Sequence, residues 1–257
     1  MNQREDLICV IMRGMKTIAL LNLSNPCKQE KVKDTISFLE MNGWNVKVSP
    51  YLYKESTPIE RASIFNEYIK TNVPFIFDVS GGDLANTTIP FLDLKAYKKS
   101  QSIFHGYSDL TCVLNVLAPI RPCVLFQICQ NTNRKEILDY LDGNEQSLIV
   151  KKAMGGNIRC LLKLAGTSYF PDLKGQDLFL ESNSGDIRRI ESYLSQLEMM
   201  GVMDEVSSIT FGQFTQLFEM NQYEWLKKRS EMYSVPVSFL DCIGHSKDSK
   251  AIRLEMR

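Results

Sequence analysis

A serine near the middle of the chain stands in a sequence context that suits a nucleophile. Ser108 follows the sequence Phe-His-Gly-Tyr, and an apolar, helix-compatible segment at 112–118 comes after it. In a strand–turn–helix of this kind the serine sits on a sharp turn at the positive end of the next helix, as in a nucleophile elbow. The usual elbow has a second glycine two residues after the serine, and Leu110 takes that place here. On spacing alone the pattern favours a simple turn, capped by Ser108 or Asp109 at a helix N-terminus.

Any chemistry that depends on a histidine must use one of two residues, because the chain contains only His105 and His245. A serine hydroxyl is a poor nucleophile until a base removes its proton, and imidazole titrates in the range that suits this task. His105 lies three residues before Ser108 on the incoming strand, so we expect its side chain to point away from the hydroxyl or into the sheet. His245 is the alternative, although a histidine alone is more often a surface residue or a structural one.

The composition excludes several classes of protein. The 257 residues contain 30 Lys plus Arg and 30 Asp plus Glu, so the balance gives no argument for binding nucleic acid or an anionic membrane. No apolar run approaches the roughly 18 residues of a membrane span. Seven scattered cysteines without a CxxC pair favour free thiols in a reducing cytoplasm over disulfides or a zinc site. Residues 1–14 do not resemble a secretory signal, and we interpret them as a candidate non-native extension.

The first half of the chain alternates apolar, strand-like runs with helical patterns. The predicted strands cover residues 17–23, 44–48, 75–79, 103–104 and 124–128, and the predicted helices cover 32–39, 58–69, 112–118 and 134–141. Such alternation is typical of a parallel sheet with helices on both faces. Its functional loops gather beyond the carboxyl ends of the strands. The turn at Gly81 and Gly82 and the turn at Ser108 both lie there, so neighbouring strand ends are expected to supply a nucleophile and backbone donors for an oxyanion.

A polar break at residues 142–146 separates this half from a less regular second half. The predicted strands there cover residues 147–150, 177–180, 208–211 and 237–240, and helical patterns cover 157–164, 187–197 and 223–233. A turn is predicted at 155–157. We therefore predict two domains, at residues 1–142 and 143–257.

Several short motifs occur in a distinctive order. They are Gly81-Gly82, Leu92-Asp93, Gly106-Tyr107-Ser108-Asp109, Gly155-Gly156-Asn157, Leu164-Ala165-Gly166-Thr167, Phe170-Pro171-Asp172-Leu173, Leu178-Phe179-Leu180-Glu181 and Gly244-His245-Ser246. Their order and spacing resemble the serine LD-carboxypeptidases, a family that also includes the microcin C immunity peptidases. The match runs from about Thr17 to His245, which is nearly the whole chain.

The resemblance implies both a fold and a catalytic arrangement. The fold is an α/β one, with an N-terminal parallel-sheet domain that is Rossmann-like and similar to class I amidotransferases, followed by a smaller C-terminal α+β domain. The catalytic arrangement is a Ser-His-Glu triad split between the domains. Ser108 is the nucleophile, His245 the general base and Glu181 the carboxylate that orients the imidazole. Without the motif order, a carboxylate at a strand end caps the next helix as often as it serves catalysis.

The resemblance also assigns supporting residues. The backbone N–H groups of Gly81, Gly82 and Asp109 are expected to hold the oxyanion. Gly156 and Asn157 are candidates for substrate binding, or for shaping the site and core of the second domain. Asp109 has a second candidate role as a helix cap.

The family hydrolyses the amide bond between an L- and a D-configured centre in murein tetrapeptides and so releases the terminal D-alanine. The immunity branch instead cleaves a peptide–nucleotide conjugate. Neither metal nor organic cofactor is implied, and the family is commonly dimeric. The expected partner is therefore a small peptide or muropeptide in the cytoplasm, with a second copy of the chain and with neither nucleic acid nor membrane.

The sequence departs from the family pattern in three places. Asp83-Leu84-Ala85 stands where an aromatic residue and a further glycine are usual, so the oxyanion loop is expected to differ. The segment between the elbow and residue 157 is short and has Pro119-Ile120-Arg121-Pro122 near the place of the family's His-Gly-Pro. The chain also ends at Arg257, so the closing strands of the second domain are expected to be trimmed.

Three hypotheses follow from these observations. The first is a cytoplasmic serine peptidase that cleaves a small amide with a free terminal carboxylate, with a murein LD-peptide as the leading substrate. The second is an immunity-type peptidase that acts on a peptidyl-nucleotide. The third is a catalytically lapsed relative that only binds a peptide or a partner.

Overall fold

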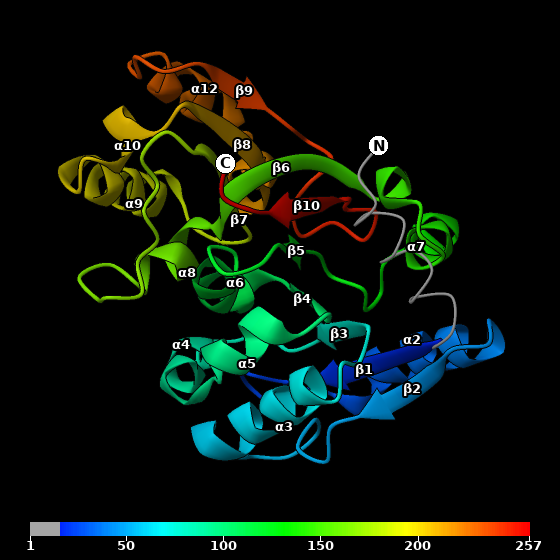
Figure 1. Cartoon of the computed structure of the whole chain (residues 1–257). Coiled ribbons are helices and arrows are strands. Elements are labelled where there is room, and N and C mark those ends of the chain that lie inside the picture. The colour runs from blue at the N-terminus through cyan, green and yellow to red at the C-terminus, as the bar shows by residue number, and fades with distance from the viewer. Residues whose placement is uncertain (1–15) are drawn as a thin grey trace, which may run out of the picture.

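The computed structural model describes residues 16–257 and shows an α/β protein built on one mixed sheet (Figure 1). The interpretation of residues 1–14 as an extension lies outside the described residues. The strands of the first half pair in parallel in the order β2-β1-β3-β4-β5. They are β1 (Thr17–Leu21), β2 (Asn45–Val48), β3 (Phe75–Asp78), β4 (Ile103–Gly106) and β5 (Cys123–Leu125). This is the parallel sheet that the alternating sequence pattern predicts.

The second half adds its own parallel strands to the same sheet. They are β6 (Ile149–Asn157), β7 (Asp177–Ser182), β8 (Ser208–Phe214) and β9 (Val237–Phe239). The last strand, β10 (Ala251–Leu254), lies between the two sets, antiparallel to β5 and parallel to β6 (Figure 1). The sheet is therefore continuous across the predicted domain boundary at residue 142, and that boundary stays a prediction.

Helices cover both faces of the first-half sheet. Successive side chains of a strand point to opposite faces, and the apolar side chains on both faces of β1 are buried. Ile18 and Leu20 of β1 belong to one apolar cluster with α2 (Gln29–Met41) and α7 (Arg134–Leu141). Ala19 and Leu21 belong to a second cluster with α3 (Pro58–Lys70) and α6 (Thr111–Leu117). Each fully buried Leu or Ile contributes roughly 1.5–3 kcal/mol to the hydrophobic stabilisation of this arrangement.

The remaining helices are short, apart from two in the second half. They are α4 (Ala85–Thr88), α5 (Leu94–Lys99), α8 (Ile158–Leu162), α9 (Ile187–Met199), α10 (Val202–Glu205), α11 (Thr215–Glu219) and α12 (Tyr223–Ser230). Three single 3₁₀ turns cover Ile89–Phe91, Ser108–Leu110 and Glu145–Ser147. Within residues 16–257, no helix is both long and apolar enough to cross a membrane.

Local sequence signals explain several helix starts. Thr57 and Glu60 form a reciprocal capping box at the start of α3, with Pro58 in its first turn. The side chain of Asp186 caps α9 by accepting a hydrogen bond from the N–H of Arg189. The sequence-based positions of these two helices are therefore close to those of the structure.

The turn predicted at residues 155–157 is wrong, because these residues form the end of strand β6. Their glycines serve close packing. A Cβ atom on Gly155 would lie 2.2 Å from the carbonyl oxygen of Phe179, and one on Gly156 would lie 2.7 Å from Thr111 Oγ1. Both glycines also have positive φ angles, 104° and 135°. The glycine pair thus lets β6 approach β7 and α6, after which Asn157 begins α8.

Candidate active site

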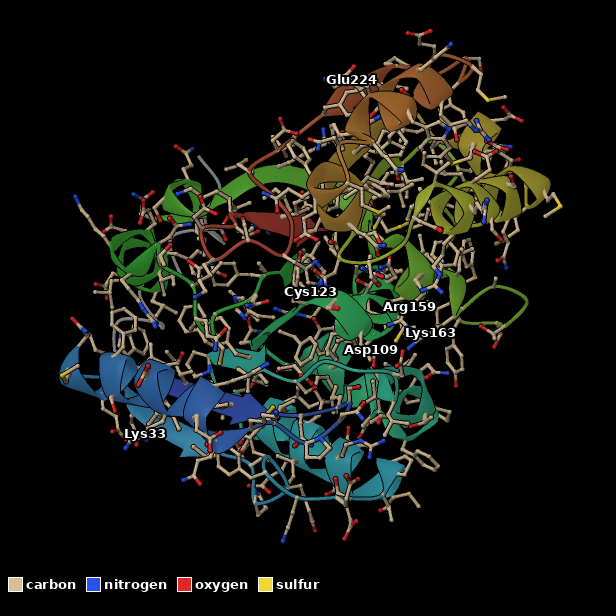
Figure 2. The ribbon with its side chains drawn as sticks, turned by 180° about the vertical axis from the view of Figure 1, so that it is seen from behind. Lys33, Asp109, Cys123, Arg159, Lys163 and Glu224 are labelled. Atoms are coloured by element: carbon tan, nitrogen blue, oxygen red, sulfur yellow. The ribbon has the colours of Figure 1, made fainter. Side chains whose placement is uncertain are left out.

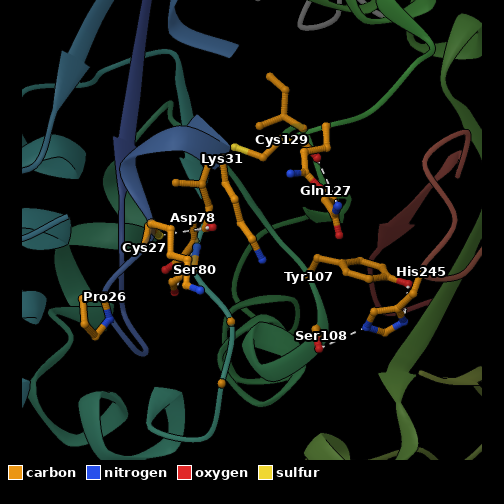
Figure 3. Close-up of a pocket in the computed structure, with 16 residues that line it drawn as sticks. Pro26, Cys27, Lys31, Asp78, Ser80, Tyr107, Ser108, Gln127, Cys129 and His245 are labelled. Atoms are coloured by element: carbon orange, nitrogen blue, oxygen red, sulfur yellow. Dashed lines mark hydrogen bonds between the residues drawn. The ribbon is translucent and has the colours of Figure 1, made fainter. Parts of the chain in front are cut away.

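A cavity of about 390 Å³ lies where the loops after β1, β3, β4 and β5 meet (Figure 3). All four loops leave the carboxyl ends of parallel strands, which is the usual place for a site in such a sheet. The lining residues are Pro26, Cys27, Lys28, Lys31, Asp78, Val79, Ser80, Gly81, Gly82, Tyr107, Ser108, Gln127, Ile128, Cys129, Gln130 and His245. The last of these comes from the second half, so both halves of the chain build the cavity.

Ser108 has the backbone of a nucleophile elbow. Its φ angle is 55°, in the left-handed region that a residue with a side chain rarely adopts. Such a conformation costs on the order of 1–3 kcal/mol and persists only where the surrounding structure holds it. Part of that support is tight packing inside the turn, since a Cβ atom on Gly106 would lie 2.8 Å from the Cβ atom of Leu110. The leucine that replaces the usual second glycine therefore fills the space that Gly106 leaves.

Three side chains predicted from the sequence lie in one hydrogen-bonded chain. His245, in the loop between β9 and β10, places Nε2 3.2 Å from Ser108 Oγ (Figure 3) and Nδ1 2.8 Å from an oxygen of Glu181. Glu181 is the next-to-last residue of β7 and is fully buried. The carboxylate can accept a hydrogen bond from Nδ1–H, and in that tautomer Nε2 has a lone pair directed at the serine hydroxyl. The structure brings the three residues together, while their catalytic roles stay a prediction.

A neighbouring amide holds the buried carboxylate. Asn157 donates from Nδ2 to the second oxygen of Glu181 over 3.0 Å, and its own Oδ1 caps helix α8 at Cys160. Asn157 and Gly156 lie outside the lining of the cavity. Their role in substrate binding stays a prediction, whereas the contact between Asn157 and Glu181 supports the alternative that they shape the site and its core.

Tyr107 is a site residue that the sequence analysis quoted only as part of the elbow motif. Its hydroxyl lies 3.3 Å from His245 Nδ1, and the two rings meet edge to face with centroids 4.7 Å apart. Burial raises the pKa of the Tyr107 hydroxyl well above its ordinary value, and the negative charge of Glu181 raises it further. The phenol therefore stays neutral and packs edge to face with the imidazole of His245.

The two glycines predicted for the oxyanion loop line the same cavity as Ser108. Within residues 16–257, no hydrogen bond takes up the N–H group of either Gly81 or Gly82. Gly82 has a φ angle of 116°, and a Cβ atom there would lie 2.0 Å from Asn25 Oδ1. The loop thus needs a glycine at this position. The oxyanion role of these groups, and of the backbone N–H of Asp109, stays a prediction.

The side chain of Asp109 fixes the elbow from behind. It is fully buried and accepts hydrogen bonds from Ser24 Oγ (2.6 Å) and from the N–H of Ala85 (2.9 Å). It also pairs with Lys163, which lies just after α8 (Figure 2). Burial alone would lower the pKa of Lys163, but the hydrogen bond and charge of Asp109 raise it above its ordinary value. This ion pair ties the second half of the chain to the nucleophile turn.

Asp83, which departs from the family pattern, joins the same cluster. Its carboxylate pairs with Arg159 of α8 and with Lys163. Arg159, Lys163 and Asp109 lie together in Figure 2. Neither cation could be predicted from the sequence, because nothing in the spacing shows that α8 packs against a loop some 80 positions earlier. The unusual Asp83 was the only signal available.

His105 has no access to the cavity. It is fully buried, its Nε2 lies 2.8 Å from the hydroxyl of Tyr140, and its Nδ1 lies 3.2 Å from the carbonyl oxygen of Ile76. The ring stacks on Phe77 at a centroid distance of 4.0 Å. Burial lowers its pKa from 6.5 to about 3. The side chain lies within the sheet, as expected for a residue three positions before Ser108.

Among the described residues, no group of three or more His, Cys, Asp or Glu side chains could hold a metal ion. The six cysteines in this part of the chain are free. Burial, reinforced by the charge of Asp78, raises the pKa of Cys27 in the cavity wall to about 12. This thiol is therefore protonated and a poor nucleophile.

Comparisons with known proteins agree along most of the chain. The family models of the LD-carboxypeptidase N-terminal and C-terminal domains match residues 18–125 and 152–257. The microcin C7 self-immunity protein MccF of Escherichia coli is 26% identical over an alignment 266 residues long, which spans 79% of this chain and 77% of the relative. A probable murein peptide carboxypeptidase of Bacillus subtilis is 23% identical over 228 residues, which cover 75% of this chain and 70% of the relative.

Solved structures show the same fold. The muramoyltetrapeptide carboxypeptidase of Oxalobacter formigenes superimposes with a TM-score of 0.76 at 21% identity, over 92% of both chains. MccF in complex with glutamyl sulfamoyl guanosine gives a TM-score of 0.79 at 20% identity, over 93% of this chain and 91% of the other. The two domain models together account for most of the described residues. The chain therefore belongs to the LD-carboxypeptidase family of serine carboxypeptidases.

Proposed function

We propose that the chain hydrolyses an amide next to a free terminal carboxylate through a Ser-His-Glu triad, with murein tetrapeptide as the leading substrate and D-alanine as the released product. The observation that carries this proposal is the chain of hydrogen bonds from Ser108 through His245 to Glu181, at 3.2 and 2.8 Å. The serine end of this chain opens into the cavity, and the glutamate end is fully buried. A small peptide fits a cavity of this size.

The reaction follows from the roles that the geometry allows. His245 Nε2 takes the proton of Ser108 Oγ as the oxygen attacks the scissile carbonyl carbon. The tetrahedral intermediate collapses, the C–N bond breaks, and the imidazolium returns the proton to the leaving amine. Water then attacks the acyl-serine with His245 again as base, and the shortened peptide leaves with a new carboxylate. Glu181 stabilises the imidazolium in both steps.

The negative oxygen of each tetrahedral intermediate needs donors that are already in place. The N–H groups of Gly81 and Gly82 suit this role because both glycines line the cavity and neither N–H group has a hydrogen-bond partner among residues 16–257. The N–H of Asp109 follows Ser108 on the elbow. Its side chain is anchored by Ser24, Ala85 and Lys163, which supports a fixed direction for that backbone group.

A second candidate function is that of an immunity-type peptidase, which cleaves a peptidyl-nucleotide. The observation that favours it is the similarity to MccF, a self-immunity protein whose solved complex contains glutamyl sulfamoyl guanosine. The proposed chemistry is the same for both substrates, since each presents an amide to the serine. The two candidates differ in what the cavity must bind on either side of that amide.

The test is a mass-spectrometric assay of the purified chain with murein tetrapeptide and with a peptidyl-nucleotide, beside the Ser108→Ala variant. We expect loss of the terminal D-alanine from the tetrapeptide by the wild type and no product with Ser108→Ala. Cleavage that survives the substitution would sink the proposed mechanism. Cleavage of the peptidyl-nucleotide alone supports the second candidate, and cleavage of neither supports a lapsed relative that only binds.

We also propose that the enzyme works as a homodimer in the cytoplasm. The resemblance to a commonly dimeric family supports the first part, and the free cysteines of the described residues are compatible with a reducing compartment. Light scattering during size-exclusion chromatography tests the dimer, because a single peak near 29.4 kDa would contradict it.

A further inference from the structure

The cavity has two chemically different ends. Ser108, Tyr107 and His245 form one end, where the reaction is proposed to occur (Figure 3). The other end is formed by the segment that leads into α2 and by the loops after β3 and β5. A substrate whose scissile amide lies at Ser108 can extend one of its sides toward this second wall.

The second wall carries positive charge that no protein carboxylate neutralises. Lys28 and Lys31 both line it, and within residues 16–257 neither forms an ion pair. The acidic residue in the lining is Asp78, which already accepts three hydrogen bonds, from the N–H of Leu23 and from the N–H and hydroxyl of Ser80. Burial raises the pKa of Asp78 to about 7, which reduces its negative charge further. The wall therefore suits an anionic group of the occupant.

Figure 3 shows the side chain of Lys31, which is exposed and lines the cavity. It leaves the first turn of α2 and runs between Ser80 and Gln127, with its ammonium group directed toward the end that contains Ser108. Lys33 lies two residues further along the helix, so it points about 200° away. Both lysines are exposed, but Lys33 lies outside the cavity lining and is seen on the outside of the molecule in Figure 2.

We propose that Lys31 is the specificity residue that binds the free carboxylate of the amino acid to be released. This inference rests on the proposed function, because it names the group that makes the enzyme a carboxypeptidase rather than an endopeptidase. An ammonium group supplies three donors and a full positive charge to a carboxylate. A C-terminal amide or a further residue in that position lacks the negative charge and loses the interaction.

The experiment compares murein tetrapeptide with its C-terminal carboxamide, using the wild type, Lys31→Met, Lys31→Arg and Lys33→Met. We expect the wild type to prefer the free acid. Lys31→Met should lower kcat/KM for the acid roughly 10- to 100-fold, which is the effect of losing one charged hydrogen bond, mainly through a higher KM. The same variant should leave kcat/KM for the carboxamide unchanged. Lys31→Arg should keep most of the preference, and Lys33→Met, with the same charge change on the same helix, should keep all of it.

Two outcomes separate this inference from the proposed function. A Lys31→Met enzyme that still prefers the acid, with cleavage still dependent on Ser108, overturns the role of Lys31 alone. Absence of cleavage by the wild type, or cleavage independent of Ser108, overturns the proposed function.

If the proposed function is overturned, calorimetric binding to Ser108→Ala decides the inference about Lys31. The acid should bind at least roughly 10-fold more tightly than the carboxamide, and adding Lys31→Met should remove the difference. Equal binding of both compounds to Ser108→Ala overturns it.

Discussion

His105 and His245 each contact a tyrosine hydroxyl, but the groups around the two imidazole rings differ. The ring of His105 is fully buried against Phe77, with one nitrogen at Tyr140 and the other at a backbone carbonyl. The ring of His245 has one nitrogen at a buried carboxylate and the other at a serine hydroxyl that faces a cavity. Burial with two neutral partners lowers the pKa of His105 and disfavours its protonated form, whereas His245 lies between a carboxylate and a hydroxyl that opens onto the cavity.

Removing each imidazole in turn tests which of the two histidines takes part in the reaction, and we expect the largest effect here. His245→Ala should lower kcat by roughly 10³-fold or more, because the serine loses its base. His105→Gln should change kcat less than about threefold, since His105 contacts neither Ser108 nor the cavity and acts only through packing. Both variants are measured with the substrate that the wild type cleaves. A large loss of kcat in a folded His105→Gln enzyme would place that residue in the reaction after all.

The acid dependence of stability tests the burial of His105. Its pKa is about 3 in the folded chain, against about 6.5 when unfolded, so the folded state disfavours the protonated form. The resulting stability is fully present above pH 6.5 and is lost as the pH falls toward 3. Between pH 6.5 and 5 the loss is about 2 kcal/mol in the free energy of unfolding. Denaturant unfolding at the two pH values checks it, and His105→Gln should show a flatter dependence.

Proton NMR gives an independent reading of the same property, because only two histidines contribute C–H signals of the imidazole type. The His105 signal should keep its position between pH 8 and 5, and its absence from the spectrum of His105→Gln assigns it. A His105 signal that titrates in this interval would mean that the ring can take up a proton inside the sheet.

Asp78 should show the opposite sign over nearly the same pH range. Its folded pKa is raised from 3.8 to about 7 because burial disfavours the carboxylate, so the folded chain holds the proton more tightly. This contribution is fully present below pH 3.8 and is lost as the pH rises through 7. The advantage of the wild type over Asp78→Asn should therefore be about 2–3 kcal/mol greater at pH 5 than at pH 8. An equal difference at the two pH values would contradict the raised pKa, whatever the variant costs in lost hydrogen bonds.

Much of this architecture could be predicted from local sequence. The apolar runs of β1 and β3, the capping box at Thr57 and the elbow around Ser108 each depend on residues a few positions apart, and the structure has them close to the predicted places. Patterns of this length can be predicted because their physical cause is local, as in the two-residue period of a strand. The grouping of Ser108, Glu181 and His245 was predicted differently, from the resemblance of the ordered motifs to those of a known family.

What the sequence analysis missed depends on contacts between distant parts of the chain. Strand β10 has only four residues, and no local pattern shows that it fits between β5 and β6. The end of the chain was expected to lack closing strands, and yet this strand joins the two halves. The ion pair of Asp109 with Lys163 and the amide contact of Asn157 with Glu181 likewise join residues 54 and 24 positions apart. Only the folded arrangement brings such groups together.

The smallest expected effects come from the two tyrosines that contact the histidines, and they test the opening comparison with equal chemical changes. Tyr140→Phe removes a donor 2.8 Å from His105 Nε2 and leaves a buried nitrogen without a partner. It should cost about 1–2 kcal/mol in the free energy of unfolding and leave kcat/KM unchanged.

Tyr107→Phe removes the hydroxyl 3.3 Å from His245 Nδ1, beside the carboxylate of Glu181. It should lower kcat roughly 2- to 10-fold, the equivalent of one neutral hydrogen bond, and alter the pH profile of kcat. Chemical denaturation gives the change in the free energy of unfolding of each variant, and initial rates give the change in its kinetic parameters. If both substitutions changed only stability, Tyr107 would be a packing residue like Tyr140, and the imidazole of His245 would owe its orientation to Glu181 alone.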